Sequence, residues 1–271
     1  MPRLQLLVID PQNDFMDIDG AALPVPGARA DMDRLAGLVD ALQGRIDDIV
    51  VTLDSHPGVA VERTSFWLAA DGGPVAPFTT ITAAELRAGR YRPRNAALLA
   101  EVQAYLDALE AGSGRTLIVW PVHCVLGTWG HAIEQRLAAS LAQWEIARAR
   151  NPDKVLKGQH PLTEQYSAFR AEVPRADDAR SQLNRPLLDR LAGDGSTLLV
   201  AGEALSHCVA ASGEDMLAQL EPARLQRTIF LTDCMSPVQG FAGAGAAFLA
   251  RLAAHGVRTM DVVQAREAFG A

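Results

Sequence analysis

An apolar run meets small and polar residues in the stretch Leu198-Leu199-Val200-Ala201-Gly202-Glu203-Ala204-Leu205-Ser206-His207-Cys208-Val209. A helix-like pattern over residues 208–220 follows, which predicts that Cys208 lies between a buried strand and the first turn of a helix. Backbone N–H groups and the positive end of the helix dipole favour a thiolate at such a place. The alternative is an inert buried thiol, so a nucleophilic role requires partners elsewhere in the chain.

Short apolar and β-branched runs alternate with helical patterns along the whole chain. This alternation is typical of βαβ units and predicts an α/β fold around a mainly parallel sheet. The predicted strands are 4–9, 48–53, 116–120, 154–156, 197–201, 228–231 and 259–263. The predicted helices are 28–43, 96–109, 131–148, 183–192, 208–220 and 240–255.

One segment does not fit a simple crossover between neighbouring strands. Glycines and prolines interrupt residues 57–114, and only one convincing helix lies inside that range. Such a stretch predicts an insertion or lid placed between two strands of the core. With no internal repeat and no evident linker, we expect a single domain over residues 1–271.

The composition excludes several classes of protein. Asp and Glu outnumber Lys and Arg by 32 − 25 residues, which gives a net charge of −7, and there is no basic run. Such a chain is not expected to bind nucleic acid or an anionic membrane. Asp10 and Gln12 interrupt the apolar N-terminus, so we expect no signal peptide, and no apolar stretch reaches the roughly 18 to 20 residues of a membrane span. Three cysteines are too few for a disulfide framework and suit a reducing cytoplasm.

Reactive side chains follow the predicted strands at their carboxyl ends, where open parallel sheets bind their ligands. After the first five strands in turn the chain carries Asp10; Asp54 with His56; His123; Lys157; and Cys208. Each has a purely structural interpretation: Asp10 begins a turn, Lys157 is a solvated strand end, and the histidines are satisfied polar residues. The convergence of all of them on one sheet edge favours a site.

The same residues carry a resemblance to a known family. The motifs are Asp10-Pro-Gln-Asn-Asp-Phe15, Asp54-Ser-His56, Trp120-Pro-Val-His-Cys124, Lys157-Gly158 with Tyr166-Ser-Ala-Phe169, and Gly202-Glu-Ala-Leu-Ser-His-Cys208-Val209. In this order they resemble the isochorismatase-like cysteine hydrolases, and within them most closely the nicotinamidase branch. The resemblance implies a three-layer α/β/α fold with a six-stranded central sheet.

The resemblance also implies a catalytic triad of Asp10, Lys157 and Cys208. A free thiol is only about 3% thiolate at pH 7, and an ammonium with a helix N-terminus is expected to lower its pKa by about two units. Asp10 is the candidate for proton transfer to and from the reacting groups. Backbone N–H groups of Ala204 and Cys208 would meet the oxyanion, and in the family the bond before Ala204 is cis.

A second group of residues suits a metal. In an Asp-x-His sequence the two side chains share one side of an extended segment, which places Asp54 beside His56. With His123 they make one carboxylate and two imidazoles, a set that suits one divalent ion of zinc, iron or manganese. The resemblance implies that this metal binds a pyridine nitrogen and aims the carboxamide at Cys208.

Further residues bear on the choice of substrate, and so do two differences from the family's sequence pattern. Phe15, Trp120 and His207 are predicted to wall the pocket, although core packing explains the first two about equally well. Some family members carry an additional histidine soon after the Asp-x-His motif, whereas this chain has Glu62 and Arg63 there. The segment between His56 and Trp120 is also much longer than in compact nicotinamidases.

The leading hypothesis is therefore a metal-assisted cysteine amidohydrolase that converts nicotinamide and water to nicotinate and ammonia through a thioester. One alternative keeps the machinery but takes another small amide, ureido or carbamoyl compound. A second alternative is a binding member of the fold without turnover. In each case we expect a cytoplasmic homo-oligomer whose partner is a small molecule, with neither nucleic acid nor a membrane.

Overall fold

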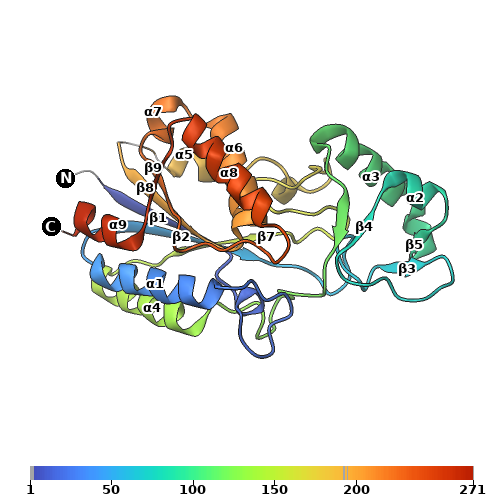
Figure 1. Ribbon diagram of the computed structural model, residues 1–271, viewed down its shortest axis with the longest axis horizontal. Coiled ribbons are helices and arrows are strands. Elements are labelled where there is room, and N and C mark those ends of the chain that lie inside the picture. The colour runs from blue at the N-terminus through green and yellow to red at the C-terminus, as the bar shows by residue number, and fades with distance from the viewer. Residues whose placement is uncertain (1–2, 192, 194, 271) are drawn as a thin grey trace.

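A parallel sheet forms the centre of the molecule (Figure 1). The computed structural model describes residues 3–191, 193 and 195–270. In these residues the sheet has six strands in the order β10-β9-β8-β1-β2-β7. Their bounds are β1 Leu4–Ile9, β2 Ile46–Asp54, β7 Asp153–Lys157, β8 Thr197–Gly202, β9 Thr228–Leu231 and β10 Arg258–Met260. The expected α/β fold with a six-stranded sheet is confirmed.

Helices cover both faces of the sheet, which explains why its inner strands carry buried apolar residues on both sides. One face carries α1 Ala28–Ala41, α4 Gln135–Arg148 and α9 Val262–Phe269. The other carries α5 Arg185–Arg190, α6 Ala210–Gln219, α7 Pro222–Leu225 and α8 Ala242–Ala254. In β1, Leu6 and Val8 pack with the first layer, and Leu7 and Ile9 with the second, as the two-residue period of a strand requires.

The segment after β2 folds around a hydrophobic cluster of its own, at one end of the molecule (Figure 1). It contains β3 Trp67–Ala69, β4 Thr79–Ile81, α2 Ala83–Arg87, β5 Tyr91–Pro93 and α3 Leu99–Ser113. A short 3-10 turn, Ala96–Leu98, leads into α3, and two others span Asn13–Phe15 and Ala179–Ser181 outside the insertion. Trp67, Val102 and Leu106 are fully buried in this cluster.

The predicted strand 116–120 is wrong as a strand of the central sheet. It forms β6, Leu117–Val119, which pairs antiparallel with β4 of the insertion. The place beside β2 is taken by β7 instead, in parallel register from Val50 with Asp153 to Asp54 with Lys157. A short apolar run predicts a buried strand, but its composition does not say which sheet it joins.

Several predicted boundaries also shift. The helix predicted from Cys208 begins at Ala210, because Leu205–Val209 form a π-type turn first. The last predicted strand ends at Met260, where Asp261 and Gln264 form a capping box that starts α9. The predicted helix 183–192 is observed as α5, and its expected last residue, Ala192, lies outside the described residues. None of the described helices is long and apolar enough to cross a membrane.

Candidate active site

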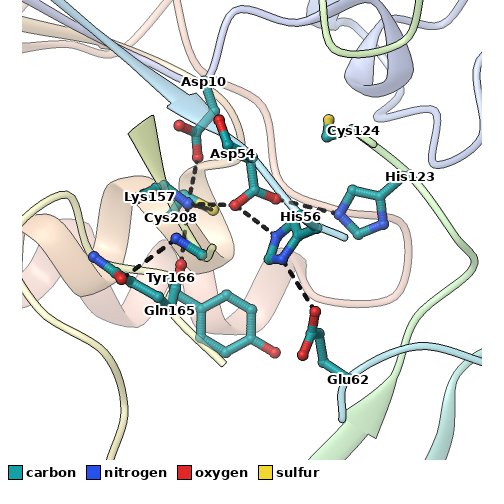
Figure 2. Close-up of polar contacts among 12 residues, drawn as sticks. Asp10, Asp54, His56, Glu62, His123, Cys124, Lys157, Gln165, Tyr166 and Cys208 are labelled. Carbon is teal, nitrogen blue, oxygen red and sulfur yellow. Dashed lines mark hydrogen bonds and ion pairs between the residues drawn. The ribbon is translucent and has the colours of Figure 1, made fainter. Parts of the chain in front are cut away.

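The reactive side chains gather at the carboxyl edge of four adjacent strands. Asp10 follows β1, Asp54 ends β2, Lys157 ends β7, and Cys208 lies in the turn after β8. These strands are neighbours in the order β8-β1-β2-β7, so residues far apart in the chain meet in space. Figure 2 shows their side chains converging on one point.

Lys157 is the centre of this arrangement. Its Nζ lies 2.9 Å from Asp10 Oδ2 and 2.8 Å from Asp54 Oδ1, between the two carboxylates (Figure 2). The same nitrogen lies 3.6 Å from Cys208 Sγ and donates to the carbonyl oxygen of Gln165 at 3.1 Å. Because Lys157 is only 2% exposed, these contacts replace the water that a free ammonium would bind.

The local backbone holds these groups in place. Asp10 has a φ of 45°, and its Oδ1 accepts a hydrogen bond of 2.6 Å from the Thr52 hydroxyl of the neighbouring strand. Gly158, just after Lys157, has a φ of 74°. A Cβ there would lie 2.5 Å from His56 Cε1, so only glycine fits between the lysine and the histidine.

The resting thiol differs from the expectation of a majority thiolate. Burial raises the pKa of Cys208 well above its ordinary value; Lys157 opposes this, while Asp10 and Asp54 add to it. Burial opposes the charge of Lys157 as well, but the two carboxylates hold its pKa well above normal, so it stays an ammonium. One positive charge facing two negative charges in a dry site does not stabilise a third anion.

The turn that presents Cys208 follows directly from β8. The Glu203–Ala204 peptide bond is cis, as expected from the family resemblance. The carbonyl oxygen of Ala204 accepts hydrogen bonds from the backbone nitrogens of His207 and Val209, at 3.0 and 3.2 Å. The expected oxyanion donors, the N–H groups of Ala204 and Cys208, thus belong to one tight turn, and their role stays a prediction.

Asp54, His56 and His123 form the second group, and they fit a divalent metal ion. All are buried, and one ligand atom from each lies within 4.8 Å of the others. His56 Nε2 lies 2.8 Å from Asp54 Oδ1, and His123 Nε2 lies 3.4 Å from Asp54 Oδ2. A buried carboxylate flanked by two imidazole nitrogens is a donor set that such ions prefer.

Three residues that were not among the predicted site residues surround this group: Glu62, Arg63 and Glu164. His56 Nδ1 lies 3.0 Å from Glu62 Oε1 (Figure 2), which leaves Nε2 facing Asp54. Arg63 Nε pairs with the same Glu62 oxygen at 3.0 Å, and Arg63 Nη1 contacts His123 Nδ1. Glu164 also approaches His56 and Glu62, so these three make a further candidate set of ligands.

The sequence carried a partial signal for these residues. Glu62 and Arg63 stand where some relatives have an additional histidine, and both are fully buried. Glu164 lies seven residues after Lys157, in a loop without periodicity, so nothing in its neighbourhood predicts its position. Burial and the nearby Glu62 raise the pKa of Glu164 to about 8, and it is therefore mostly protonated at neutral pH.

The two histidines differ in charge. Burial and Arg63 oppose the protonated form of His56, but Asp54 and Glu62 raise its pKa to about 9. Burial and Arg63 lower the pKa of His123 to about 4. His123 is therefore neutral, and one carbonyl oxygen, that of Pro121, lies 2.8 Å from its Nδ1 and 3.2 Å from Arg63 Nη1.

A small cavity of about 20 Å³ lies beside the thiol. Its lining includes Cys208, Asp54 and the three expected wall residues Phe15, Trp120 and His207. The Phe15 ring lies 5.3 Å from that of His123, and the Trp120 ring lies 5.0 Å from that of His207, in edge-on contacts. Cys124, in contrast, is buried in the main hydrophobic core.

Two characterised relatives resemble this chain over most of its length, although no protein-family model matches it. The nicotinamidase of Escherichia coli (strain K12) is 30% identical over 211 residues, which cover 77% of this chain and 74% of the relative. The nicotinamidase of Saccharomyces cerevisiae is 27% identical over 209 residues, which cover 76% of this chain and 78% of the relative.

Solved structures share the fold at lower identity. The yeast nicotinamidase has a TM-score of 0.63 at 22% identity, with 95% of this chain and 99% of that chain covered. The Acinetobacter nicotinamidase/pyrazinamidase has a TM-score of 0.64 at 21% identity, covering 97% and 98%. A Pyrococcus horikoshii pyrazinamidase, whose structure holds zinc, has a TM-score of 0.56 at 20% identity, covering 96% and 99%.

The fold, the convergent side chains and these relatives define a hydrolase that acts on an amide C–N bond. Within that class, the chain belongs to the nicotinamidase family. Its fold is also that of an isochorismatase-like hydrolase from Alkaliphilus metalliredigens, with a TM-score of 0.55 at 19% identity.

Proposed function

We propose that this enzyme hydrolyses nicotinamide to nicotinate and ammonia through a thioester on Cys208. The observation that carries the proposal is the Lys157 ammonium, which touches Asp10, Asp54 and Cys208 in a buried site. Both relatives reported above by sequence identity are nicotinamidases, which supports nicotinamide as the substrate.

In the proposed mechanism Asp10 acts as the base that frees the sulfur. The Cys208 thiol is protonated at rest, and Asp10 is one of the groups that raise its pKa. As Sγ attacks the amide carbon, the thiol proton passes to Asp10, and Lys157 stabilises the charge shared by the carboxylates and the sulfur. Asp10 then protonates the departing nitrogen, the C–N bond breaks, and ammonia leaves.

The second half of the reaction repeats the proton transfer. Asp10 removes a proton from a water molecule that attacks the thioester carbon, the C–S bond breaks, and the thiol regains its proton. In both halves the carbonyl oxygen becomes an anion, and we assign the backbone N–H groups of Ala204 and Cys208 to it. Removing one such donor costs roughly 10²–10³ in kcat in a serine protease, a measure of what the turn contributes.

Asp54, His56 and His123 are proposed to hold one divalent ion, with zinc favoured because a neutral His123 and a carboxylate match its preferences. Glu62 would orient His56 from its Nδ1 side, as outer carboxylates do for ligating histidines. When bound, the ion supplies a Lewis acid that can hold a ring nitrogen of the substrate. The zinc in the Pyrococcus horikoshii structure supports the choice of metal.

Ammonia release tests the substrate assignment. Purified enzyme incubated with nicotinamide, pyrazinamide, benzamide, a ureido compound and a carbamoyl compound should release ammonia most efficiently from nicotinamide. Benzamide lacks a ring nitrogen and is expected to be the poorest aromatic substrate. Release from the ureido or carbamoyl compound alone would transfer the assignment to the alternative class of small amides.

Metal content tests the ligand assignment. Replacing His123 by alanine removes one metal ligand. Loss of a residue that only supports a ligand weakens metal binding by roughly 10–100-fold, so loss of the ligand itself should weaken it at least as much. Elemental analysis after dialysis should therefore find about one equivalent in the unchanged protein and far less in the variant. His160→Ala, at a histidine outside both ligand groups, is the matched control. Equal metal content in the two variants would contradict the assignment.

We propose that residues 1–271 form one domain, that residues 57–114 are its insertion, and that the enzyme works as a cytoplasmic homo-oligomer. The insertion supports the single-domain proposal because Arg63 and Glu62 belong to it and contact the metal-ligand histidines of the core.

A further inference from the structure

A large cavity of about 430 Å³ lies where the insertion meets the helical layer formed by α6 and α8. We name it the side cavity; its lining includes Tyr105, Leu109, Leu117, Ala210, Ala244 and Ala247. The first two come from α3 and the last two from α8. Its volume falls in the range of about 300–1,000 Å³ that is typical of ligand pockets.

The side cavity adjoins the small cavity at Cys208. Glu164, Tyr166 and His207 line both volumes and therefore form the wall between them. The small cavity of about 20 Å³ has room for about one water molecule, far less than an aromatic carboxamide needs. A substrate therefore has to displace part of its wall, and empty volume is available on the far side of these three residues.

Tyr166 and His207 in this wall each make one side-chain hydrogen bond. The Tyr166 hydroxyl accepts a hydrogen bond of 2.9 Å from Trp120 Nε1, which fixes its ring. His207 is uncharged, because burial and the nearby Arg115 lower its pKa to about 4. Its Nδ1 lies 2.9 Å from the Ser206 hydroxyl, and its ring meets Trp120, Tyr166 and Phe241 through edge-on or tilted contacts. An uncharged ring held this way can rotate at a lower cost than an ion-paired one.

The chemistry of the side cavity favours an uncharged, apolar occupant. Its arginines are paired: Arg115 Nη1 lies 3.0 Å from Glu172 Oε2, and Arg251 bonds to Glu214. Apolar side chains and the Tyr105 ring make up much of the rest of the lining. A phosphate or carboxylate would have to break these ion pairs, whereas an aryl or alkyl group would only displace water.

We propose that the side cavity receives a ring substituent of the substrate, so that the enzyme hydrolyses aromatic carboxamides bearing an uncharged aryl or alkyl group. This inference rests on the proposed function, because it requires the carboxamide to sit at Cys208. The insertion would then help to bind the substrate, because its helix α3, together with β6, builds one side of the side cavity.

The test compares nicotinamide with pyridine-3-carboxamides that carry one phenyl group at each free ring position in turn. The unchanged enzyme should hydrolyse at least one phenyl isomer with kcat/KM within about tenfold of that for nicotinamide. Ala247→Trp, which fills the side cavity from α8, should lower the ratio of phenyl to parent kcat/KM by about tenfold or more. Ala246→Trp, the adjacent exposed alanine outside the lining, should leave the ratio at its original value.

Two results would overturn the inference: every phenyl isomer reacting more than about a hundredfold slower than nicotinamide, or an unchanged ratio in Ala247→Trp. Absence of ammonia from nicotinamide itself would instead count against the proposed function. In that event, calorimetric binding of the phenyl compounds to Cys208→Ala and to Cys208→Ala with Ala247→Trp still decides: tenfold weaker binding to the double variant supports the side cavity, and equal binding refutes it.

Discussion

Replacing Cys208 by alanine is expected to abolish ammonia release while the fold stays intact. The side chain is 6% exposed and loses one sulfur atom, so the free energy of unfolding should fall by only about 1 kcal/mol, a Tm change of a few degrees. Turnover should fall by a factor on the order of 10⁵ or more, as it does when a protease loses its nucleophile. Steady-state ammonia release and thermal unfolding measure the two effects.

Cys234→Ala provides the matched control for this change. Cys234 is also a buried, free cysteine that follows a strand of the central sheet, but it makes no contact with Lys157 among the described residues. Its replacement should shift Tm similarly and preserve turnover. Substantial activity in Cys208→Ala would show that Cys208 is not the nucleophile, whatever the control shows.

Replacing Asp10 by asparagine should lower kcat/KM by roughly 10²–10⁴, the usual contribution of a positioned base. Asparagine keeps an oxygen for the 2.6 Å hydrogen bond from Thr52, so the backbone is expected to hold. The thiol should respond in the opposite direction. Because the Asp10 charge helps to raise the pKa of Cys208, its removal lowers that pKa and speeds alkylation at a fixed pH below it.

The pH profile of alkylation separates a base from a merely structural residue. Asp10→Asn should shift the profile to lower pH, and Lys157→Met should shift it to higher pH, because Lys157 lowers the thiol pKa. A disrupted site would lose turnover without this pair of opposite shifts. Shifts in the same direction, or unchanged turnover in Asp10→Asn, would argue against proton transfer by Asp10.

The positions of the reactive groups were predictable because each ends or follows a strand. Asp10, Asp54 and Cys208 follow apolar runs that are easy to recognise, whereas only Val155 and Leu156 precede Lys157. Parallel strands bring such ends to one edge. His123 reaches the same place by another route. Its strand, β6, pairs with β4 of the insertion instead of joining the central sheet, and a parallel bridge between His56 and Val125 aligns its loop with the end of β2.

Other features depended on packing that no local pattern encodes. Glu62 and Arg63 enter the site because the first residues of the insertion pair with Trp120, close to His123 in the chain. Glu164 enters it because its loop lines both cavities. The protonated state of Cys208 also depends on packing that no local pattern encodes. The sequence shows a lysine that lowers the pKa of Cys208, but only the structure shows that both carboxylates are buried beside it.

The mass of the peptide that contains Cys208, isolated by rapid acid quench during turnover of nicotinamide, tests the central claim most directly. The account predicts a transient increase equal to one nicotinoyl group, located on Cys208, that decays as nicotinate forms. Ammonia release without acylation of Cys208, or with the acyl group on Cys124 or Cys234, would contradict it.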